Sequence, residues 1–290
     1  MQALIGALVA RVTAPQRLRR LAIIRVGAPL AILGFLSTRL AHPEDWLADT
    51  GFRVPALADD WRQPLVIPAL PSWAAWAVCV ALVVTGLAVA AGALTRIASA
   101  AFAILLAYVA LADRLEAFTV SKLAPMIALV LCLTPSGARD SVDAWWRRRR
   151  DPAWRPPELV TGGCVAVFQI LVPVFYLSSG ICKAQGDWLS DRFVLWSHLH
   201  DSYQTRASWF LGNHLPAVAW TILQGATLAF EVGAPLWFGW RRARPFALAY
   251  GIAMHAMIGL MFGPVIWFSL LMIVLLVASF ANFKQVIRQP

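Results

Sequence analysis

The chain has 290 residues, of which 60% are apolar and only 14% are charged, and its mean hydropathy is +0.66. Soluble globular domains carry about 25% charged residues, so this composition excludes that class. The net charge of +10 does not require nucleic acid as a partner, because the basic residues lie between apolar runs, where membrane topology explains them.

Several apolar runs approach the ~20 residues that an α-helix needs to cross a bilayer. The first run is flanked by basic residues and lacks a small-residue cleavage site, so we interpret it as a retained helix and not as a signal peptide. The sequence therefore predicts an all-α, polytopic bundle of about eight transmembrane helices, forming one domain over residues 1–290. The predicted spans are residues 21–38, 73–95, 97–112, 118–134, 160–182, 216–240, 245–262 and 264–281.

The distribution of basic residues predicts how these spans are oriented. Cytoplasmic segments are enriched in Lys and Arg, whereas acidic residues contribute little to insertion. Alternate segments, beginning with the N-terminal one, hold most of the arginines, including the run Arg147–Arg150. We therefore expect both termini to be cytoplasmic and Lys183 to face outward, in a multi-pass protein of a bacterial inner membrane in contact with the lipid bilayer.

Ionisable residues inside the spans are functional candidates, because burial of a charge in the bilayer is costly. Arg25 and Glu231 lie within their spans and could meet from the same side of the membrane, so we predict either a structural Arg25–Glu231 ion pair or a role for Glu231 in proton handling or ligand binding. His255 lies near mid-membrane, where a packing role competes with a role in a site. Lys122 begins the fourth span, where snorkelling to the interface is the simpler interpretation.

The fifth span runs directly into Lys183, with Asp187 and Trp188 shortly after it. One interpretation is snorkelling, in which the aliphatic stem follows the lipid and the charge reaches the interface. The other is a general base, because a partly dry environment favours the neutral amine, which can accept a proton. The spacing alone leaves both interpretations open.

The outer loop over residues 183–215 combines aromatic residues with His198, His200 and His214. Such a composition predicts a segment that lies in the membrane interface and covers the space between the helices. No metal is expected, because His198 and His200 have no cysteine and only one acidic residue near them.

Four motifs, in this order along the chain, resemble a known family of membrane proteins. This family is the carboxylase-like transmembrane domain, often called the HTTM domain, which vitamin K-dependent gamma-carboxylase shares with many bacterial proteins. The motifs are Leu21-Ala22-Ile23-Ile24-Arg25-Val26-Gly27, then Leu133-Thr134-Pro135-Ser136-Gly137-Ala138 with Ser141-Val142-Asp143, then Gly180-Ile181-Cys182-Lys183 with Asp187-Trp188, and finally Phe230-Glu231-Val232-Gly233-Ala234-Pro235 with His255.

The resemblance implies a chemistry and a set of site residues. The carboxylase oxidises a reduced quinone with oxygen, and a lysine starts its reaction by removing a proton. By resemblance, Lys183 would be this general base and His255 would join it as a catalytic residue. Glu231 would shape the pocket, and we expect Trp188, Glu231, Lys122 and His198 to bind substrate or quinol. The implied cofactor is reduced quinone.

The chain also departs from the family pattern. At the start of the fourth span the family often has an Asn-His pair, whereas this chain has Ser121-Lys122. The chain ends at Pro290, without the carboxylase's large extracytoplasmic region. We therefore expect quinol-linked redox or carboxylase-like chemistry at the extracytoplasmic face, on a peptide or small-molecule substrate, with neighbouring maturation proteins as partners.

Two other functions are weighed against this enzyme. The first alternative is a non-catalytic, DoxX-like membrane subunit that scaffolds a peptide- or redox-maturation complex. A transporter is less favoured, because the sequence has no repeat symmetry and no pair of interrupted helices.

Overall fold

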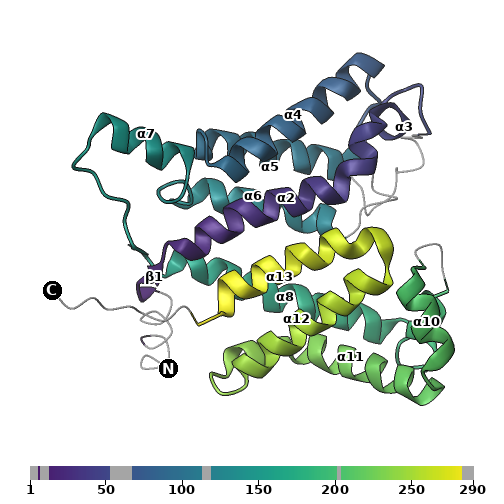
Figure 1. The fold of residues 1–290 in the computed structure, drawn as a ribbon. Helices are drawn as coiled ribbons and strands as arrows, with labels where there is room; N and C mark the ends of the chain where they lie inside the picture. The colour runs from purple at the N-terminus through teal and green to yellow at the C-terminus, as the bar shows by residue number, and fades with distance from the viewer. Residues whose placement is uncertain (1–5, 7–12, 53–66, 113–118, 201–203, 283–290) are drawn as a thin grey trace. The chain divides into compact units, whose positions relative to one another are not determined.

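The computed structural model describes residues 6, 13–52, 67–112, 119–200 and 204–282. The described chain is helical apart from two short strands, β1 (Gln16–Arg17) and β2 (Leu159–Val160). It divides into two compact units, an N-terminal unit over Leu18–Val160 and a C-terminal unit over Thr161–Pro290 together with Met1–Arg17. An all-helical fold is thereby confirmed (Figure 1).

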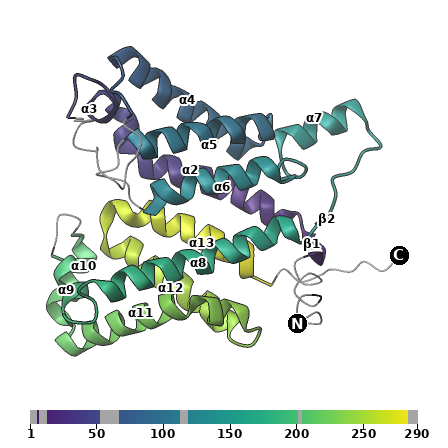
Figure 2. The same ribbon diagram turned by 180° about the vertical axis from the view of Figure 1, so that it is seen from behind.

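The N-terminal unit is built on long apolar helices that pack in chain order. Contacts join α2 to α4, α4 to α5 and α5 to α6, and α6 also contacts α2 (Figure 2). The core holds the side chains of Ile24, Leu82, Phe102 and Leu123, all at most 1% exposed. The helices of this unit are α2 (Arg19–Ala41), α3 (Pro43–Leu47), α4 (Ser72–Ala91), α5 (Thr95–Ala112), α6 (Thr119–Leu133) and α7 (Val142–Arg150).

The C-terminal unit has a comparable arrangement of long helices. Here α8 contacts α11, α11 contacts α12, α12 contacts α13, and α13 contacts α8. Gln169 on α8 donates a hydrogen bond to the carbonyl oxygen of Ser279 on α13 over 2.8 Å. The elements are α8 (Gly163–Gln185), α9 (Val194–His198), α10 (Arg206–His214), α11 (Ala217–Gly239), α12 (Arg244–Met261), the 3-10 turn η2 (Gly263–Val265) and α13 (Ile266–Phe280).

Each predicted span coincides with one helix, although the start of the fourth at Phe118 lies outside the described residues. By length and hydropathy, six helical segments of the described chain can cross a membrane: α2, α4, α5, α8, α11 and η2–α13. The 15-residue α6 is shorter than a usual span, and α12 carries Arg244 and His255, which lower its hydropathy. Six candidate membrane-spanning helices are therefore present among the described residues, while the count of eight and the cytoplasmic termini stay predictions.

Candidate functional site

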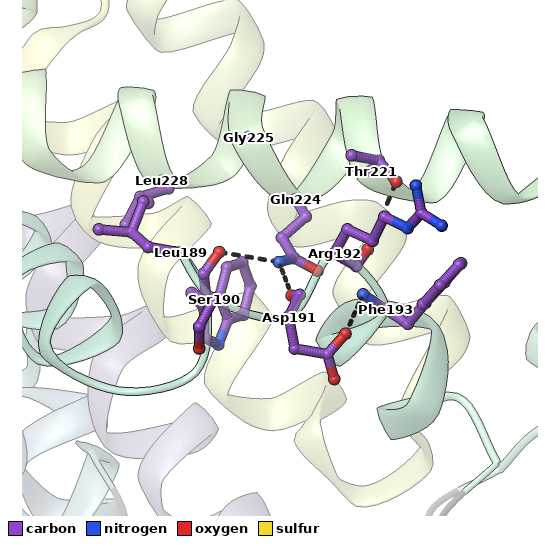
Figure 3. A pocket seen from close by; sticks show the side chains of 10 residues that line it. Leu189, Ser190, Asp191, Arg192, Phe193, Thr221, Gln224, Gly225 and Leu228 are labelled. Carbon is purple, nitrogen blue, oxygen red and sulfur yellow. Dashed lines mark hydrogen bonds between the residues drawn. The ribbon is translucent and has the colours of Figure 1, made fainter.

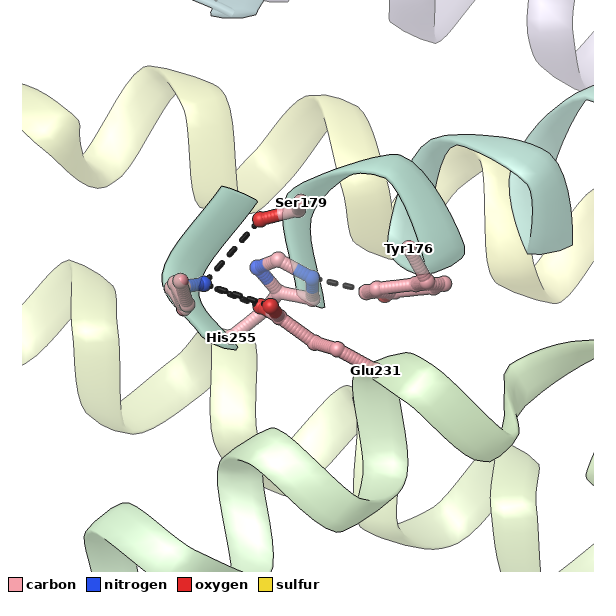
Figure 4. Close-up of polar contacts among 5 residues, drawn as sticks. Tyr176, Ser179, Glu231 and His255 are labelled. Atoms are coloured by element: carbon pink, nitrogen blue, oxygen red, sulfur yellow. Dashed lines mark hydrogen bonds and ion pairs between the residues drawn. The ribbon is translucent and has the colours of Figure 1, made fainter. Parts of the chain in front are cut away.

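A buried ion pair joins α8 to α11 in the C-terminal unit. The Nζ atom of Lys183 lies 2.5 Å from Oε1 and 2.6 Å from Oε2 of Glu231, and it donates a further hydrogen bond to Oγ of Ser179 over 3.0 Å (Figure 4). The side chain of Glu231 is only 7% exposed and that of Lys183 is 26% exposed. The carboxylate is thus removed from solvent, while the side chain of Lys183 as a whole is partly exposed.

Helix periodicity explains why α8 supplies several of the groups at this site. Tyr176, Ser179 and Lys183 are three and seven residues apart, so they lie on one face of the helix. Gly180, on the same face, allows α8 to approach α11 closely. A Cβ atom at Gly180 would lie 2.8 Å from the backbone nitrogen of Val232 and 3.0 Å from Cβ of Glu231. The close contact of the two helices brings Lys183 and Glu231 together.

A second polar contact lies beside the ion pair. The hydroxyl group of Tyr176 and Nε2 of His255 on α12 are 2.7 Å apart, and both side chains are buried (Figure 4). Within the described part of the chain, Nδ1 of His255 is buried and has no hydrogen-bond partner. Since buried polar atoms are nearly always paired, this nitrogen is a candidate to bind a ligand or an ordered water.

Aromatic rings surround the Tyr176–His255 contact. Phe230 meets the ring of Tyr176 edge to face with centroids 5.1 Å apart, and Phe238 stacks on it at 6.3 Å. On the other side, Phe268 meets the imidazole ring edge to face at 5.4 Å. These contacts fix both polar side chains in an apolar environment, where an unpaired nitrogen is costly.

A pocket of about 470 Å³ lies between residues 188–193, which follow α8, and the N-terminal half of α11 (Figure 3). Trp188 links the two features, because its ring lines the pocket and also lies 5.1 Å from Nζ of Lys183. Gln224 holds the lining segment in place: its Nε2 donates to the carbonyl oxygens of Trp188 and Asp191, and its Oε1 accepts from the backbone nitrogen of Leu195. Arg192 and Asp191 are the charged residues of the lining.

Helices α9 and α10 cover the same end of the unit. Leu199, Trp220 and Met261 form a buried apolar cluster there. Thr205 caps the start of α10 and donates a hydrogen bond to the carbonyl oxygen of Leu260 at the end of α12 over 2.8 Å. The described residues of segment 183–215 are therefore packed on the helix ends. The predicted ligand-binding residue His198 is exposed in this segment.

Arg25 has a different environment from the one that the sequence suggested. Its guanidinium group is fully buried in the N-terminal unit and donates to the carbonyl oxygens of Val89, 3.1 Å away, and of Ala90, 2.5 Å away, and also to that of Asp140. The last carbonyls of a helix have no partner within it, so Arg25 satisfies the end of α4. The expected Arg25–Glu231 ion pair is thus replaced: Glu231 is paired with Lys183, and Arg25 binds main-chain oxygens.

The structure brings together Lys183, Glu231 and Trp188. His255 bonds Tyr176, which lies on the same face of α8 as Lys183. Lys122 is exposed on α6 in the N-terminal unit. Among the described residues there is no group of three or more His, Cys, Asp or Glu side chains that could hold a metal ion.

Three residues of the site were not singled out from the sequence: Tyr176, Ser179 and Gln224. The spacing of Tyr176 and Ser179 from Lys183 was the available signal for the first two, because it places them on the same face of one helix. Gln224 had a weaker signal, namely an amide side chain inside an apolar span.

Together, the apolar helices and the buried polar site define an integral membrane protein of the helical-bundle class with ionisable groups clustered in one unit. The HTTM domain family matches residues 24–282, nearly the whole chain, and the protein therefore belongs to this family. No curated protein and no solved structure matches the chain.

Proposed function

We propose that this protein is a quinol-linked membrane enzyme that carries out redox or carboxylase-like chemistry at the extracytoplasmic face, with Lys183 as its general base. The observation that carries the proposal is the partly exposed side chain of Lys183. Its ammonium group is bound to the buried carboxylate of Glu231 and lies over the ring of Trp188, a residue that lines a pocket. An ionisable pair at membrane depth beside a pocket is a functional candidate by default.

The lining of the pocket suits a neutral, flat, aromatic head group. Trp188 and Phe193 offer ring surfaces, Leu228 adds apolar area, and the charges of Arg192 and Asp191 balance each other. The unpaired Nδ1 of His255 supplies a further polar group in the same unit. A reduced quinone bound there would supply electrons and a hydroxyl proton, with oxygen as the electron acceptor.

The Lys183–Glu231 pair can supply a base by proton transfer within the pair, which keeps the net charge of the pair at zero until the amine accepts a substrate proton and the pair becomes positively charged. Transfer of a proton from Nζ of Lys183 to the carboxylate of Glu231 crosses a 2.5 Å contact and leaves a neutral amine beside a neutral acid. A dry environment disfavours separated charges, which makes this neutral form accessible. The free amine of Lys183 can then accept a substrate proton, and Ser179 orients it through the hydrogen bond to Nζ.

The experiment compares oxidation of a reduced naphthoquinone by purified wild-type protein and by Lys183→Arg. Arginine keeps the positive charge but stays protonated, so it cannot act as a base. We expect Lys183→Arg to oxidise the quinol at least 100-fold more slowly than wild type, because general base catalysis usually contributes a factor of about 10²–10⁴. The melting temperature of the variant should be unchanged. Arg241→Lys, at an exposed position of the same unit, is the control and should keep wild-type activity. Equal activity of Lys183→Arg and wild type would overturn the assignment of the base.

A non-catalytic, DoxX-like scaffold is the second candidate, and the same ion pair supports it. The contact of Nζ of Lys183 with both carboxylate oxygens of a nearly buried glutamate also fits a purely structural pair that holds α8 against α11. Organic extraction followed by mass spectrometry distinguishes the two functions: an enzyme should retain quinone after purification, and a scaffold should retain none while co-purifying with its partner proteins.

A further inference from the structure

Helix α7 and the residues that follow it present an unusual concentration of arginine and tryptophan on one surface of the N-terminal unit. Every side chain from Trp145 to Arg150 is exposed, and Ala144 is the buried residue of the helix. The two indole rings are about half exposed, 50% for Trp145 and 52% for Trp146. Large exposed aromatic residues beside a basic run are costly in water, which indicates a surface that is normally covered.

We propose that α7 is a docking surface for the anionic headgroups of phospholipids in the adjoining membrane leaflet. This inference is independent of the proposed enzymatic function, since all of its residues lie in the N-terminal unit. We infer a lipid surface as the partner because α7 combines two side-chain types that are enriched at membrane–water interfaces. These are indole rings, which lie at headgroup level, and cations, which attract anionic lipid.

The arginines are held over the tryptophan rings. The guanidinium carbon of Arg149 lies 4.4 Å from the ring centroid of Trp145, and that of Arg150 lies 5.5 Å from the ring centroid of Trp146. A stacked guanidinium group keeps its N–H donors free at its edges, in the planar geometry that matches a phosphate. The pairs thus present headgroup-binding donors above rings that can enter the interface.

Hydrogen bonds fix α7 to the turn between α4 and α5. The carboxylate of Asp143 accepts from the backbone nitrogens of Leu94 and Thr95, each 2.8 Å away, and from Oγ1 of Thr95 at 2.7 Å. The backbone nitrogen of Asp143 donates in turn to the carbonyl oxygen of Gly92 over 2.9 Å, and Ser141 caps the helix through the backbone nitrogen of Ala144.

This attachment sets the position of α7 in the membrane. Because α4 ends and α5 begins at this turn, and both helices are long and apolar enough to cross a bilayer, the turn lies at a membrane face. The basic residues of α7 are therefore held at the depth of the lipid headgroups. The surface is formed before any lipid binds, so little ordering cost accompanies binding.

The test uses the full chain in nanodiscs made of phosphatidylcholine alone or with 30% phosphatidylglycerol, and it follows amide hydrogen exchange over residues 142–150. With phosphatidylglycerol we expect exchange in this segment to slow at least threefold, and 0.5 M salt should reverse the effect because it screens headgroup charge. The variant with glutamine at positions 147, 148, 149 and 150 should lose the response. Arg241→Gln with Arg242→Gln, a basic turn of the other unit, is the matched control and should leave it unchanged.

Native mass spectrometry of the same proteins gives a second measurement. Wild type should retain more phosphatidylglycerol molecules than the glutamine variant, and the control should retain as many as wild type. Equal exchange in both kinds of nanodisc would overturn the proposal. So would protection of α7 by an added oligonucleotide but not by phosphatidylglycerol, since that result would assign the surface to a nucleic acid.

Discussion

Lys183 and Glu231 lie 48 residues apart in the sequence, yet both carboxylate oxygens of Glu231 are within 2.6 Å of the Lys183 ammonium nitrogen. The side chain of Glu231 is only 7% exposed, and its negative charge is compensated by the ammonium group of Lys183. Removal of charges from water is expensive, and the mutual attraction, the hydrogen bond to Ser179 and the contact of Nζ with the ring of Trp188 offset this cost. A change to either residue of the pair should therefore alter both the stability of the C-terminal unit and the geometry of the candidate site.

The first prediction concerns this pair. Lys183→Met should destabilise the protein by about 3–5 kcal/mol, because it leaves the buried carboxylate of Glu231 uncompensated. The double variant Lys183→Met with Glu231→Met should recover much of this loss, since it removes both charges together. The free energy of unfolding of wild type, the single variant and the double variant is measured in detergent, by thermal or denaturant-induced unfolding. Lys122→Met is the control and should have little effect, as Lys122 is exposed. Additive losses in the double variant would show that the two residues do not interact.

The second prediction concerns the close approach of α8 and α11. Gly180→Ala adds a methyl group 2.8 Å from the backbone of Val232, where no flexible side chain can yield. Overpacking of this kind costs about 1–3 kcal/mol, and it should also move Lys183 away from Glu231. Gly225→Ala on α11 is the matched control, because a Cβ atom there meets nothing within 4 Å. This control should be neutral or stabilising by up to about 1 kcal/mol, the helix preference of alanine over glycine. Equal melting temperatures for the two variants would contradict the packing argument.

The helices could be predicted from the sequence more fully than the site could. Long apolar runs determine where helices form, and each expected span coincides with one helix. Depth in the membrane identified Arg25, Glu231 and Lys183 as unusual, because a charge stands out in an apolar run. Depth does not reveal which way a side chain faces, so the sequence suggested the wrong neighbour for Glu231 and gave no indication that Arg25 binds main-chain carbonyls. Helix packing, set by contacts such as that at Gly180, determines those partners.

The third prediction concerns Arg25. Arg25→Met should destabilise the protein by about 3 kcal/mol or more, because several buried carbonyl oxygens lose their donor. Arg25→Lys keeps the charge but replaces the planar fork of donors by one ammonium group, so it should recover only part of the loss. Arg96→Lys, at an exposed position of α5, is the control and should be silent. Detergent melting curves measure all three, and full recovery by Arg25→Lys would show that charge alone matters at this position.

The fourth prediction concerns the Tyr176–His255 hydrogen bond. Tyr176→Phe removes the hydroxyl group and leaves Nε2 of His255 unpaired in an apolar environment, which should cost about 1–3 kcal/mol. Tyr176→Phe combined with His255→Phe should cost less than the sum of the two single changes, because no buried polar atom is then left without its partner. Double-mutant analysis of the melting data measures the coupling. A coupling energy near zero would argue that the two groups do not bond in the membrane.

The last prediction concerns topology, on which the extracytoplasmic assignment of Lys183 depends. The alternation of basic segments predicts that Ser190, close to Lys183 in the chain, faces outward and that Asp151, directly after α7, faces the cytoplasm. Both positions are exposed, so accessibility does not differ between them. In a background with the four native cysteines replaced, an impermeant thiol reagent applied to intact cells should label Ser190→Cys and leave Asp151→Cys unlabelled. Labelling of both variants after the cells are opened controls for reactivity. The opposite pattern in intact cells would invert the orientation, moving Lys183 to the cytoplasmic side and α7 to the outer leaflet.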